Sequence, residues 1–203
     1  MRIGLLADIH GDSMLTRLAL DAFWRRSVDR VLVLGDLFES GQCMDTLIDL
    51  LVEANVEGVY GNHDLGFCHE PEPWLPRRFS PRVLAYMASL RSSYELGPFL
   101  FTHGFPFWDP TDPTIYYLGG HPGEPGVVDP CFSEFPHRIM FHGHFHRWSI
   151  ATPSGPVDWD QTTPFRLAPE NRYVVTVHAL QYGHCAVFDV EEDVLEPIWL
   201  DEV

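Results

Sequence analysis

Positive charge is scarce in this sequence. Its 203 residues include 13 lysines and arginines against 29 aspartates and glutamates, which gives a formal net charge of −16 at pH 7. Proteins that bind long nucleic acids need basic side chains to displace counterions from the phosphates. We therefore expect no long nucleic-acid partner. A small phosphorylated substrate stays compatible with this charge, because a metal ion in a site can outweigh a distant negative field.

Cysteine is also scarce, and long apolar runs are missing. The four cysteines, Cys43, Cys68, Cys131 and Cys185, form no close pair, so they predict free thiols in a reducing cytoplasm. No apolar run reaches the roughly 18 residues of a membrane-spanning helix. The first four residues lead directly into a strand-like run, so we expect no signal peptide. These features predict a cytoplasmic protein without a membrane partner, and they leave the oligomeric state open.

Strand and helix patterns alternate in the first half of the chain. Apolar runs at 3–7, 31–34 and 56–60 predict strands. Helices are predicted between them at 14–26, with Ser13 as the N-cap, and at 42–54. This rhythm is typical of parallel strands joined by right-handed crossovers. A third helix is predicted at about 81–91, with Pro81 in its first turn.

The second half is richer in short strands. Strands are predicted at 98–102, 138–142 and 149–151, and a hairpin is predicted from 173–178 and 185–189 across 180–183. A last strand at 195–200 contains Pro197, which argues against a central place in a sheet. We therefore predict an α/β fold of one domain over 1–203. Its core is a two-layer mixed β-sheet flanked by helices, an α/β/β/α sandwich.

Two proline-rich stretches resist a regular assignment. Residues 66–82 and 105–137 are long enough to be functional lids, and both directly follow motif residues. We predict that they surround the mouth of the site, the alternative being surface padding. Trp108, Tyr116 and Tyr117 stack on a nucleobase or aryl group, or else form a small core of the second stretch. The histidines of these stretches are expected at the surface: His69, His121 and His137.

Chemistry-bearing residues follow the ends of five strand-like runs. The motifs are Asp8-Ile9-His10, Gly35-Asp36, Gly61-Asn62-His63-Asp64, His103-Gly104 and Gly143-His144-Phe145-His146. Ligands of open α/β sheets bind outside the carboxyl ends of the strands. If the five strands share a sheet, the motifs meet in one crevice.

These motifs offer a donor set without sulfur. It consists of two carboxylates, one amide and four imidazoles, from Asp8, His10, Asp36, Asn62, His103, His144 and His146. Such a set suits Mn²⁺ above all, with Fe, Zn²⁺ or Ni²⁺ as alternatives. Seven donors exceed what one ion binds, but a bridging carboxylate divides them between two ions. Two divalent ions keep a net positive charge beside only two carboxylates, and that attracts a phosphate anion.

A simpler alternative exists for some of these residues. Asp8, Asp36 and Asn62 could each cap a following helix, since Asp and Asn are preferred N-caps. Capping accounts for one such residue at a time, but not for all seven at five strand ends. His142 directly precedes a motif, and we expect it to support a ligand or to pack in the interior.

The five motifs, in this order, resemble those of the calcineurin-like metallophosphoesterase superfamily, and the small size resembles its compact bacterial phosphodiesterase branch. The resemblance implies a binuclear centre. Asp8, His10, Asp36 and His146 would hold one ion, and Asp36, Asn62, His103 and His144 the other, with Asp36 bridging. It further implies that a metal-bound hydroxide attacks phosphorus, that His63 protonates the leaving oxygen, and that Asp64 orients His63.

One departure from the superfamily pattern narrows the substrate. Protein Ser/Thr phosphatases and diadenosine tetraphosphatases carry an Arg-Gly at the end of the segment that follows Gly-Asp, and here Ser40 replaces that arginine. A bidentate phosphate contact is missing there, unless Arg77, Arg78 or Arg82 supplies it from the first stretch. The favoured function is hydrolysis of small phosphodiesters or phosphomonoesters, possibly nucleotides among them. Protein phosphatase, dinucleoside-polyphosphate hydrolase and a non-catalytic scaffold are the alternatives.

Overall fold

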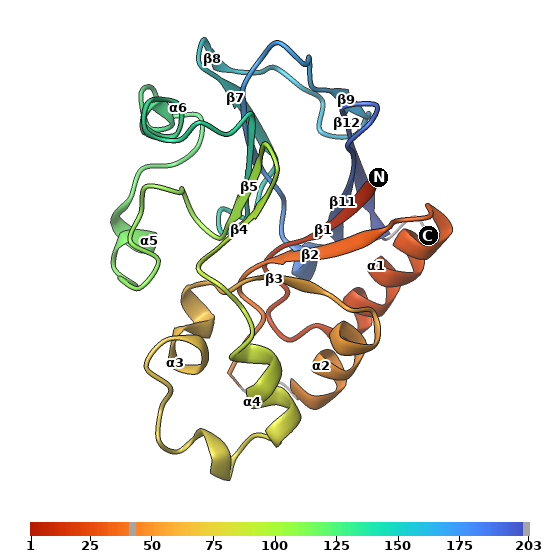
Figure 1. Ribbon diagram of the computed structural model, residues 1–203, viewed down its shortest axis with the longest axis vertical. Coiled ribbons are helices and arrows are strands. Elements are labelled where there is room, and N and C mark those ends of the chain that lie inside the picture. The colour runs from red at the N-terminus through yellow and green to blue at the C-terminus, as the bar shows by residue number, and fades with distance from the viewer. Residues whose placement is uncertain (41–43, 201–203) are drawn as a thin grey trace.

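The computed structural model describes residues 1–40 and 44–200. Within them, twelve strands form two six-stranded mixed sheets that pack face to face, with helices on both outer faces (Figure 1). This arrangement confirms the predicted two-layer β core flanked by helices.

The first sheet contains the three strands of the predicted βαβαβ unit. Its order is β3 (Glu57–Val59), β2 (Arg30–Leu34), β1 (Arg2–Leu6), β11 (His184–Asp189), β12 (Val194–Trp199) and β9 (Phe165–Arg166). The pairs β1–β2 and β2–β3 are parallel, whereas β11, β12 and β9 add antiparallel. The parallel half therefore brings the ends of β1, β2 and β3 to one edge.

The second sheet carries the remaining two motif strands at its centre. Its order is β4 (Ser93–Leu96), β5 (Phe99–Thr102), β6 (Ile139–His142), β10 (Tyr173–Thr176), β7 (Ser149–Thr152) and β8 (Gly155–Pro156). The strands β5, β6 and β10 run parallel to one another. Their carboxyl ends therefore also lie at one edge.

The helices of the first sheet begin close to their predicted positions. They are α1 (Ser13–Arg25), α2 (Met44–Glu53) and α4 (Pro81–Met87). Asp12 caps α1, because its carboxylate accepts the N–H of Leu15 at 2.8 Å, so the prediction of Ser13 as the cap was wrong. Gln42 and Cys43, which we predicted to begin the second helix, lie outside the described residues. Helix α4 ends before Arg91, at Met87.

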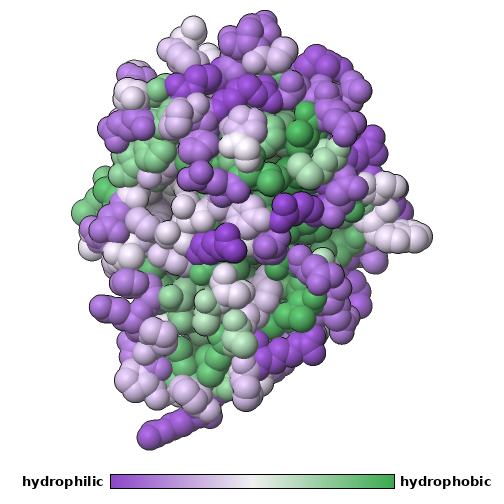
Figure 2. Space-filling model, in the orientation of Figure 1, coloured by the Kyte–Doolittle hydropathy of each residue, from purple (hydrophilic) through white to green (hydrophobic). Residues whose placement is uncertain are grey.

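Apolar side chains fill two main layers. Between the sheets, Leu5 and Phe188 of the first sheet pack with Phe101 and Phe141 of the second, all fully buried. On the other face of the first sheet, Leu6 and Val33 pack against the helices. Figure 2 shows hydrophilic side chains around most of the margin of this view, with hydrophobic patches between them in both the upper and the lower half. Burial on both faces explains why β1 and β2 are nearly continuous apolar runs.

The predicted hairpin between 173–178 and 185–189 was wrong. Strand β10 pairs with β6 and β7 in the second sheet, whereas β11 pairs with β1 and β12 in the first. The connecting turn η3 (Leu180–Tyr182) crosses from one sheet to the other. It is held by buried Leu180, whose N–H donates to the carbonyl of Ala7 at 2.7 Å, just beyond β1.

Strand β12 meets the restriction that Pro197 imposes. Its partner β9 pairs only at Val194 and Leu195, so β12 has a single neighbouring strand at Pro197, opposite Ala186. The missing N–H of proline therefore costs no ladder hydrogen bond to a second strand.

The two proline-rich stretches are packed parts of the fold. Residues 66–82 contain η2 (Leu75–Arg77) and bury Phe67 and Leu75 in the helix-side core. Residues 105–137 contain α5 (Ile115–Leu118) and α6 (Asp129–Glu134). Phe105, Trp108 and Tyr116 are buried there against the outer face of the second sheet. Trp108 and Tyr116 thus form the core of this stretch, while Tyr117 is 73% exposed.

The cysteines described are free thiols, as predicted: Cys68, Cys131 and Cys185. Cys43 lies outside the described residues. Among the residues that are described, no helix combines the length and apolar character needed to cross a bilayer.

Candidate metal centre

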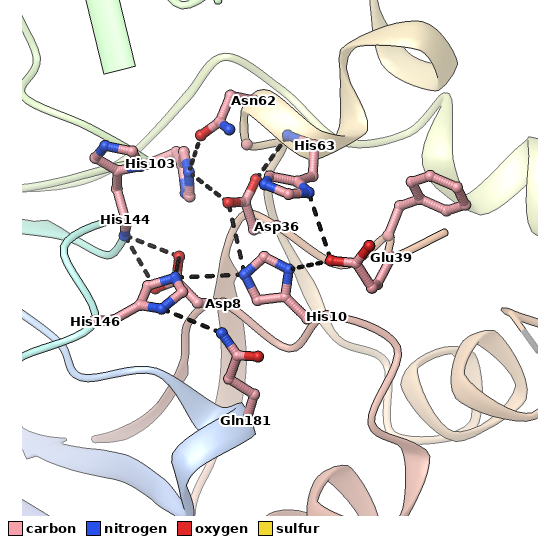
Figure 3. A network of polar contacts seen from close by, with 12 residues as sticks. Asp8, His10, Asp36, Glu39, Asn62, His63, His103, His144, His146 and Gln181 are labelled. Atoms are coloured by element: carbon pink, nitrogen blue, oxygen red, sulfur yellow. Dashed lines mark hydrogen bonds and ion pairs between the residues drawn. The ribbon is translucent and has the colours of Figure 1, made fainter. Parts of the chain in front are cut away.

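The five motifs meet at the edge shared by the two packed sheets. Strands β1, β2 and β3 belong to the first sheet and β5 and β6 to the second, so the condition that all five share a sheet is not met. The motifs converge nevertheless, because the parallel strands of the first sheet and those of the second sheet end at the same edge of the sandwich. Figure 3 shows their side chains turned toward one another.

The backbone turns sharply at most of these residues. Five of the seven predicted donors have positive φ angles: Asp8 52°, His10 47°, Asp36 55°, His144 67° and His146 49°. This left-handed conformation costs a residue with a β-carbon about 1–2 kcal/mol. Non-glycine residues hold it where the surrounding structure imposes it, and such residues cluster at functional sites.

Two motif glycines stand where a side chain has no room. A β-carbon on Gly61 would lie 2.1 Å from Oδ1 of Asp36, and one on Gly143 would lie 2.8 Å from Oδ2 of Asp8. The glycines therefore let the loops close on the two carboxylates.

Asp8, His10 and His146 form a first group, with donor atoms all within 4.8 Å of one another. His10 Nε2 and His146 Nε2 are 3.4 Å apart, and His146 Nε2 is 3.3 Å from Asp8 Oδ1. Both oxygens of Asp8 also accept the N–H of His144, at 3.0 Å, which ties the last motif to the first.

Asp36, His103 and His144 form a second group, again within 4.8 Å. His103 Nε2 lies 3.2 Å from Asp36 Oδ2 and 3.0 Å from Asn62 Oδ1. Asp36 Oδ2 is also 3.9 Å from His10 Nε2, so this carboxylate lies between the two groups. All seven predicted donors are thus brought together.

The donor spacing fits metal coordination. Two donors about 2.1 Å from one ion lie about 3.4 Å apart at a tetrahedral angle. The N–N distance of 3.4 Å between His10 and His146 matches that value. The residues present therefore fit divalent ions, with Asp36 placed to be shared.

The second nitrogen of each imidazole lies against another polar group. His103 Nδ1 is 2.7 Å from the carbonyl of Leu34, and His144 Nε2 is 2.9 Å from the carbonyl of Tyr116. A carbonyl only accepts, so these nitrogens donate, and in the neutral ring the opposite nitrogen keeps the lone pair that can bind an ion. This tautomer control is typical of metal-binding histidines.

Side chains lie beside the other two imidazoles, a carboxylate oxygen at His10 and an amide nitrogen, which only donates, at His146. His10 Nδ1 lies 3.4 Å from Glu39 Oε2, and His146 Nδ1 lies 3.1 Å from Gln181 Nε2. The sequence analysis missed both Glu39 and Gln181. Glu39 is three residues after Asp36 and could have been noticed, but Gln181 reaches the site only because η3 crosses between the sheets.

The expected role of Asp64 does not fit its surroundings. Its buried carboxylate accepts the N–H groups of Leu37, Phe38 and Gly61 at 2.9–3.2 Å. Within the described residues it makes no hydrogen bond or ion pair with the His63 ring. Asp64 instead ties the loop after β2 to the loop after β3. The carboxylate that lies near His63 is Glu39, whose Oε2 is 3.8 Å from His63 Nδ1.

Asp36 and His103 form a buried ion pair. Burial by itself raises the pKa of Asp36, but the charge and hydrogen bond of His103 outweigh it and hold that pKa well below its usual range. Burial lowers the pKa of His103, yet Asp36 raises it to about 9. Burial and the charge of His103 lower the pKa of His144 to about 4, which favours the neutral form that binds metals.

The capping alternative is not what these residues do. Asp8 accepts from His144, Asp36 Oδ1 accepts the N–H of His63 at 2.9 Å, and Asp12 caps the helix that follows Asp8. His142 is buried, with Nε2 2.7 Å from Thr176 Oγ1, so it packs in the interior as expected.

The three arginines considered for a phosphate contact have other surroundings in the fold. Arg82 pairs with Asp49 of α2 at 3.1 Å, and Arg78 lies over the ring of Phe79. Arg77 belongs to η2, in the stretch that packs on the helix-side core.

Comparison with known proteins identifies the family. Residues 1–158 match the calcineurin-like phosphoesterase superfamily domain. The chain belongs to this superfamily. It is therefore a metal-dependent phosphoric ester hydrolase, as the sequence predicted. A comparison with curated protein sequences found no match.

Solved structures of similar fold include several phosphoesterases. A metallophosphoesterase from Sphaerobacter thermophilus has a TM-score of 0.74 and 20% identity, over 98% of this chain and 88% of that one. An archaeal phosphodiesterase has a TM-score of 0.57 and 16% identity, over 98% and 99%. A putative diadenosine tetraphosphatase has a TM-score of 0.56 and 16% identity, over 98% and 94%. At these identities the likeness concerns the fold.

Proposed function

We propose that this superfamily member hydrolyses small phosphodiesters or phosphomonoesters with two divalent ions, Mn²⁺ above all. The observation that carries the proposal is the pairing of the imidazoles. Three of the four, His10, His103 and His144, have one ring nitrogen beside a carbonyl or carboxylate oxygen, which leaves the other nitrogen for an ion. Such support fixes ring orientation and tautomer for metal binding.

The residues divide between the ions as the resemblance implies. Asp8, His10 and His146 would hold one ion, and Asn62, His103 and His144 the other, with Asp36 shared. When bound, the ions supply charge neutralisation at the phosphate and lower the pKa of a water. The protein's own contribution is a set of donors fixed in advance by strained loops and buried hydrogen bonds.

His63 is the proton donor in this proposal. Its backbone N–H is fixed on Asp36, and its ring lies edge-on to that of His10, with 4.8 Å between centroids. The side chain is 35% exposed, so it can reach a leaving oxygen above the site. Glu39 lies 3.8 Å from its Nδ1 and would orient the ring. Asp64 supports the site through the backbone.

Small substrates fit this site better than phosphoproteins or dinucleoside polyphosphates. Ser40 stands where those enzymes carry an arginine, and its N–H donates to Glu39 at 2.8 Å. The two donor groups consist of histidines and carboxylates, and Arg78 and Arg82 have their contacts elsewhere. A substrate with several phosphates would leave its outer charges without a basic partner.

The test is an assay of purified protein with added Mn²⁺. We expect hydrolysis of bis-p-nitrophenyl phosphate that a chelator abolishes and Mn²⁺ restores. A protein that binds the metal and stays inactive on diesters and monoesters alike would overturn the proposal and favour the scaffold alternative.

A further inference from the structure

A third group of metal-competent side chains adjoins the two groups described above. It consists of His10, Glu39 and His63, whose donor atoms all lie within 4.8 Å of one another. Figure 3 shows Glu39 on the side of the His10 ring that is turned away from His146. His10 therefore belongs to two groups, because its Nε2 lies 3.4 Å from His146 Nε2 and its Nδ1 lies 3.4 Å from Glu39 Oε2.

One oxygen of Glu39 lies between the two imidazoles of this third group. Oε2 is 3.4 Å from His10 Nδ1 and 3.8 Å from His63 Nδ1. The other oxygen, Oε1, accepts the N–H of Ser40 at 2.8 Å, which helps to hold the carboxylate in place. Two donors about 2.1 Å from one ion lie about 3.4 Å apart at a tetrahedral angle. The first distance matches that value, and rotation of the partly exposed His63 side chain can shorten the second.

The donors of the third group suit zinc. Two imidazoles and one carboxylate, with water in the fourth position, are a common set of zinc ligands. Zinc also binds a given site of nitrogen and oxygen donors more tightly than manganese does. The side chains of Glu39 and His63 are 40% and 35% exposed, so an ion can reach them from the solvent and keep a water ligand.

An ion in the third group replaces the proton between His10 and Glu39. When His10 Nε2 binds an ion of the first group, Nδ1 keeps the ring proton and donates it to Glu39. An additional ion at Nδ1 displaces that proton to the solvent. The two ions then lie on opposite sides of one ring and repel each other. The third group therefore binds its ion more weakly than the other two and fills only when metal is in excess.

We propose that His10, Glu39 and His63 form an inhibitory site for a third divalent ion, Zn²⁺. The inference rests on the phosphoesterase function proposed above and names a regulation of the same site. An ion on His63 Nδ1 prevents protonation of that nitrogen. The ring then no longer forms the imidazolium that gives up a proton readily near neutral pH. Excess zinc thus disables the proton donor while the two ions of the centre stay bound.

Equilibrium dialysis against Zn²⁺ tests the site without any measurement of activity. We expect three ions per chain in the wild type, the weakest of them in the third group. Glu39→Gln keeps an oxygen that accepts from His10 but loses the negative charge. It should weaken the third ion at least as much as the loss of a supporting residue does, about 10–100-fold. Glu53→Gln, at an exposed glutamate of α2, is the matched control and should still bind three ions.

A second variant tests the imidazole of the proton donor. His63→Ala removes a ligand and should likewise lose the weakest zinc ion. His69→Ala, at another exposed histidine, is the matched control and should keep it.

Kinetics of the Mn²⁺-loaded protein test the inhibition. Added Zn²⁺ should slow the hydrolysis of bis-p-nitrophenyl phosphate by the wild type and by Glu53→Gln. Glu39→Gln should need about tenfold more zinc, or still more, for the same inhibition. Exchange of zinc for manganese within the centre would inhibit the wild type and Glu39→Gln equally, so the difference between these two proteins reports on the third ion.

Each outcome supports or overturns the inference. The absence of a third zinc ion in the wild type would overturn it, as would a weakest step that Glu39→Gln or His63→Ala leaves unchanged. Equal inhibition of the wild type and Glu39→Gln would also overturn it. Hydrolysis together with any of these results overturns the inference alone. Three bound ions, the weakest lost in both variants, without hydrolysis would overturn the proposed function and support the third metal site.

Discussion

The two halves of the candidate metal centre are supported in different ways. In one half, the backbone-held half, His103 and His144 donate to the main-chain carbonyls of Leu34 and Tyr116. In the other, the side-chain-held half, His10 and His146 lie against the side chains of Glu39 and Gln181. Main-chain carbonyls are fixed by the fold, whereas Glu39 and Gln181 can change with one substitution.

The fold therefore determines how His103 and His144 are oriented, whereas single substitutions can change the orientation of His10 and His146. The backbone-held half is also the more enclosed, with 1% of the His103 side chain exposed against 28% for His146. We therefore expect the backbone-held half to bind its ion more tightly. The side-chain-held half is more open to solvent, and Glu39, which lies beside His10, is itself 40% exposed.

The largest effect is expected where the halves meet. Asp36→Asn removes the shared negative charge and should lower kcat/KM on the order of 10³-fold or more, because several kcal/mol of charge stabilisation depend on both ions. Metal analysis should show less than one ion per chain. Asp21→Asn, an exposed carboxylate change on α1, is the control. Two retained ions in Asp36→Asn would contradict a bridging role.

A change at His63 should lower the rate of the reaction and leave metal binding in both halves of the centre unchanged. His63→Ala is expected to lower kcat by roughly 10²–10⁴-fold through loss of proton transfer, with metal content unchanged. Glu39→Gln should lower kcat less, because only the orientation of the His63 ring is affected. Asp64→Asn should act mainly on thermal stability, because it weakens the hydrogen bonds that tie two loops together. Full activity of His63→Ala would remove this residue from the mechanism.

A change at Gln181 should affect one half alone. Gln181→Ala removes the partner of His146 and should weaken the lower-affinity metal site about 10–100-fold, the usual effect of a lost supporting residue. Calorimetric titration with Mn²⁺ resolves the two sites, and Gln161→Ala, at an exposed glutamine, is the matched control. If the tighter site weakened instead, the assignment of the halves would be reversed.

The smallest effect concerns the interior behind the backbone-held half. Burial lowers the pKa of His142 to about 3. Below pH 6.5 this histidine is therefore protonated in the unfolded chain but stays neutral in the folded one. Stability is complete above pH 6.5 and falls as the pH decreases. Between pH 7 and 5 this histidine should cost about 2 kcal/mol. Denaturation of His142→Gln should show a correspondingly flatter pH dependence, and that of exposed His69→Gln an unchanged one.

The sequence predicted which side chains converge better than it predicted the groups around them. The five motifs contain all seven side chains that meet at the sheet edge, because each motif follows an apolar strand. The carbonyls of Leu34 and Tyr116 have no sequence signature, since any residue supplies a carbonyl. Gln181 was missed for a related reason, because its place depends on a crossing between sheets that a local pattern at 173–189 mistook for a hairpin.

Local sequence rules also assigned two roles to the wrong residue, the N-cap of α1 and the carboxylate that lies beside His63. Ser13 and Asp12 are both good N-caps, and only the loop geometry after His10 selects Asp12. Asp64 follows His63 directly in sequence, but its side chain points into the interior, where four hydrogen bonds from three N–H donors hold it. The sequence left open whether the aromatic residues of 105–137 stack on a substrate or form a small core. Trp108 and Tyr116 are buried against the second sheet and therefore belong to the core.

The most direct test of this account is the number and affinity of bound ions. Metal-free protein titrated with Mn²⁺ should bind two ions per chain in two resolved steps, the tighter belonging to the backbone-held half. His103→Ala should abolish the tighter step and His146→Ala the weaker. Binding of a single ion by the intact protein, with all seven donors present, would contradict the binuclear centre on which the proposed function depends.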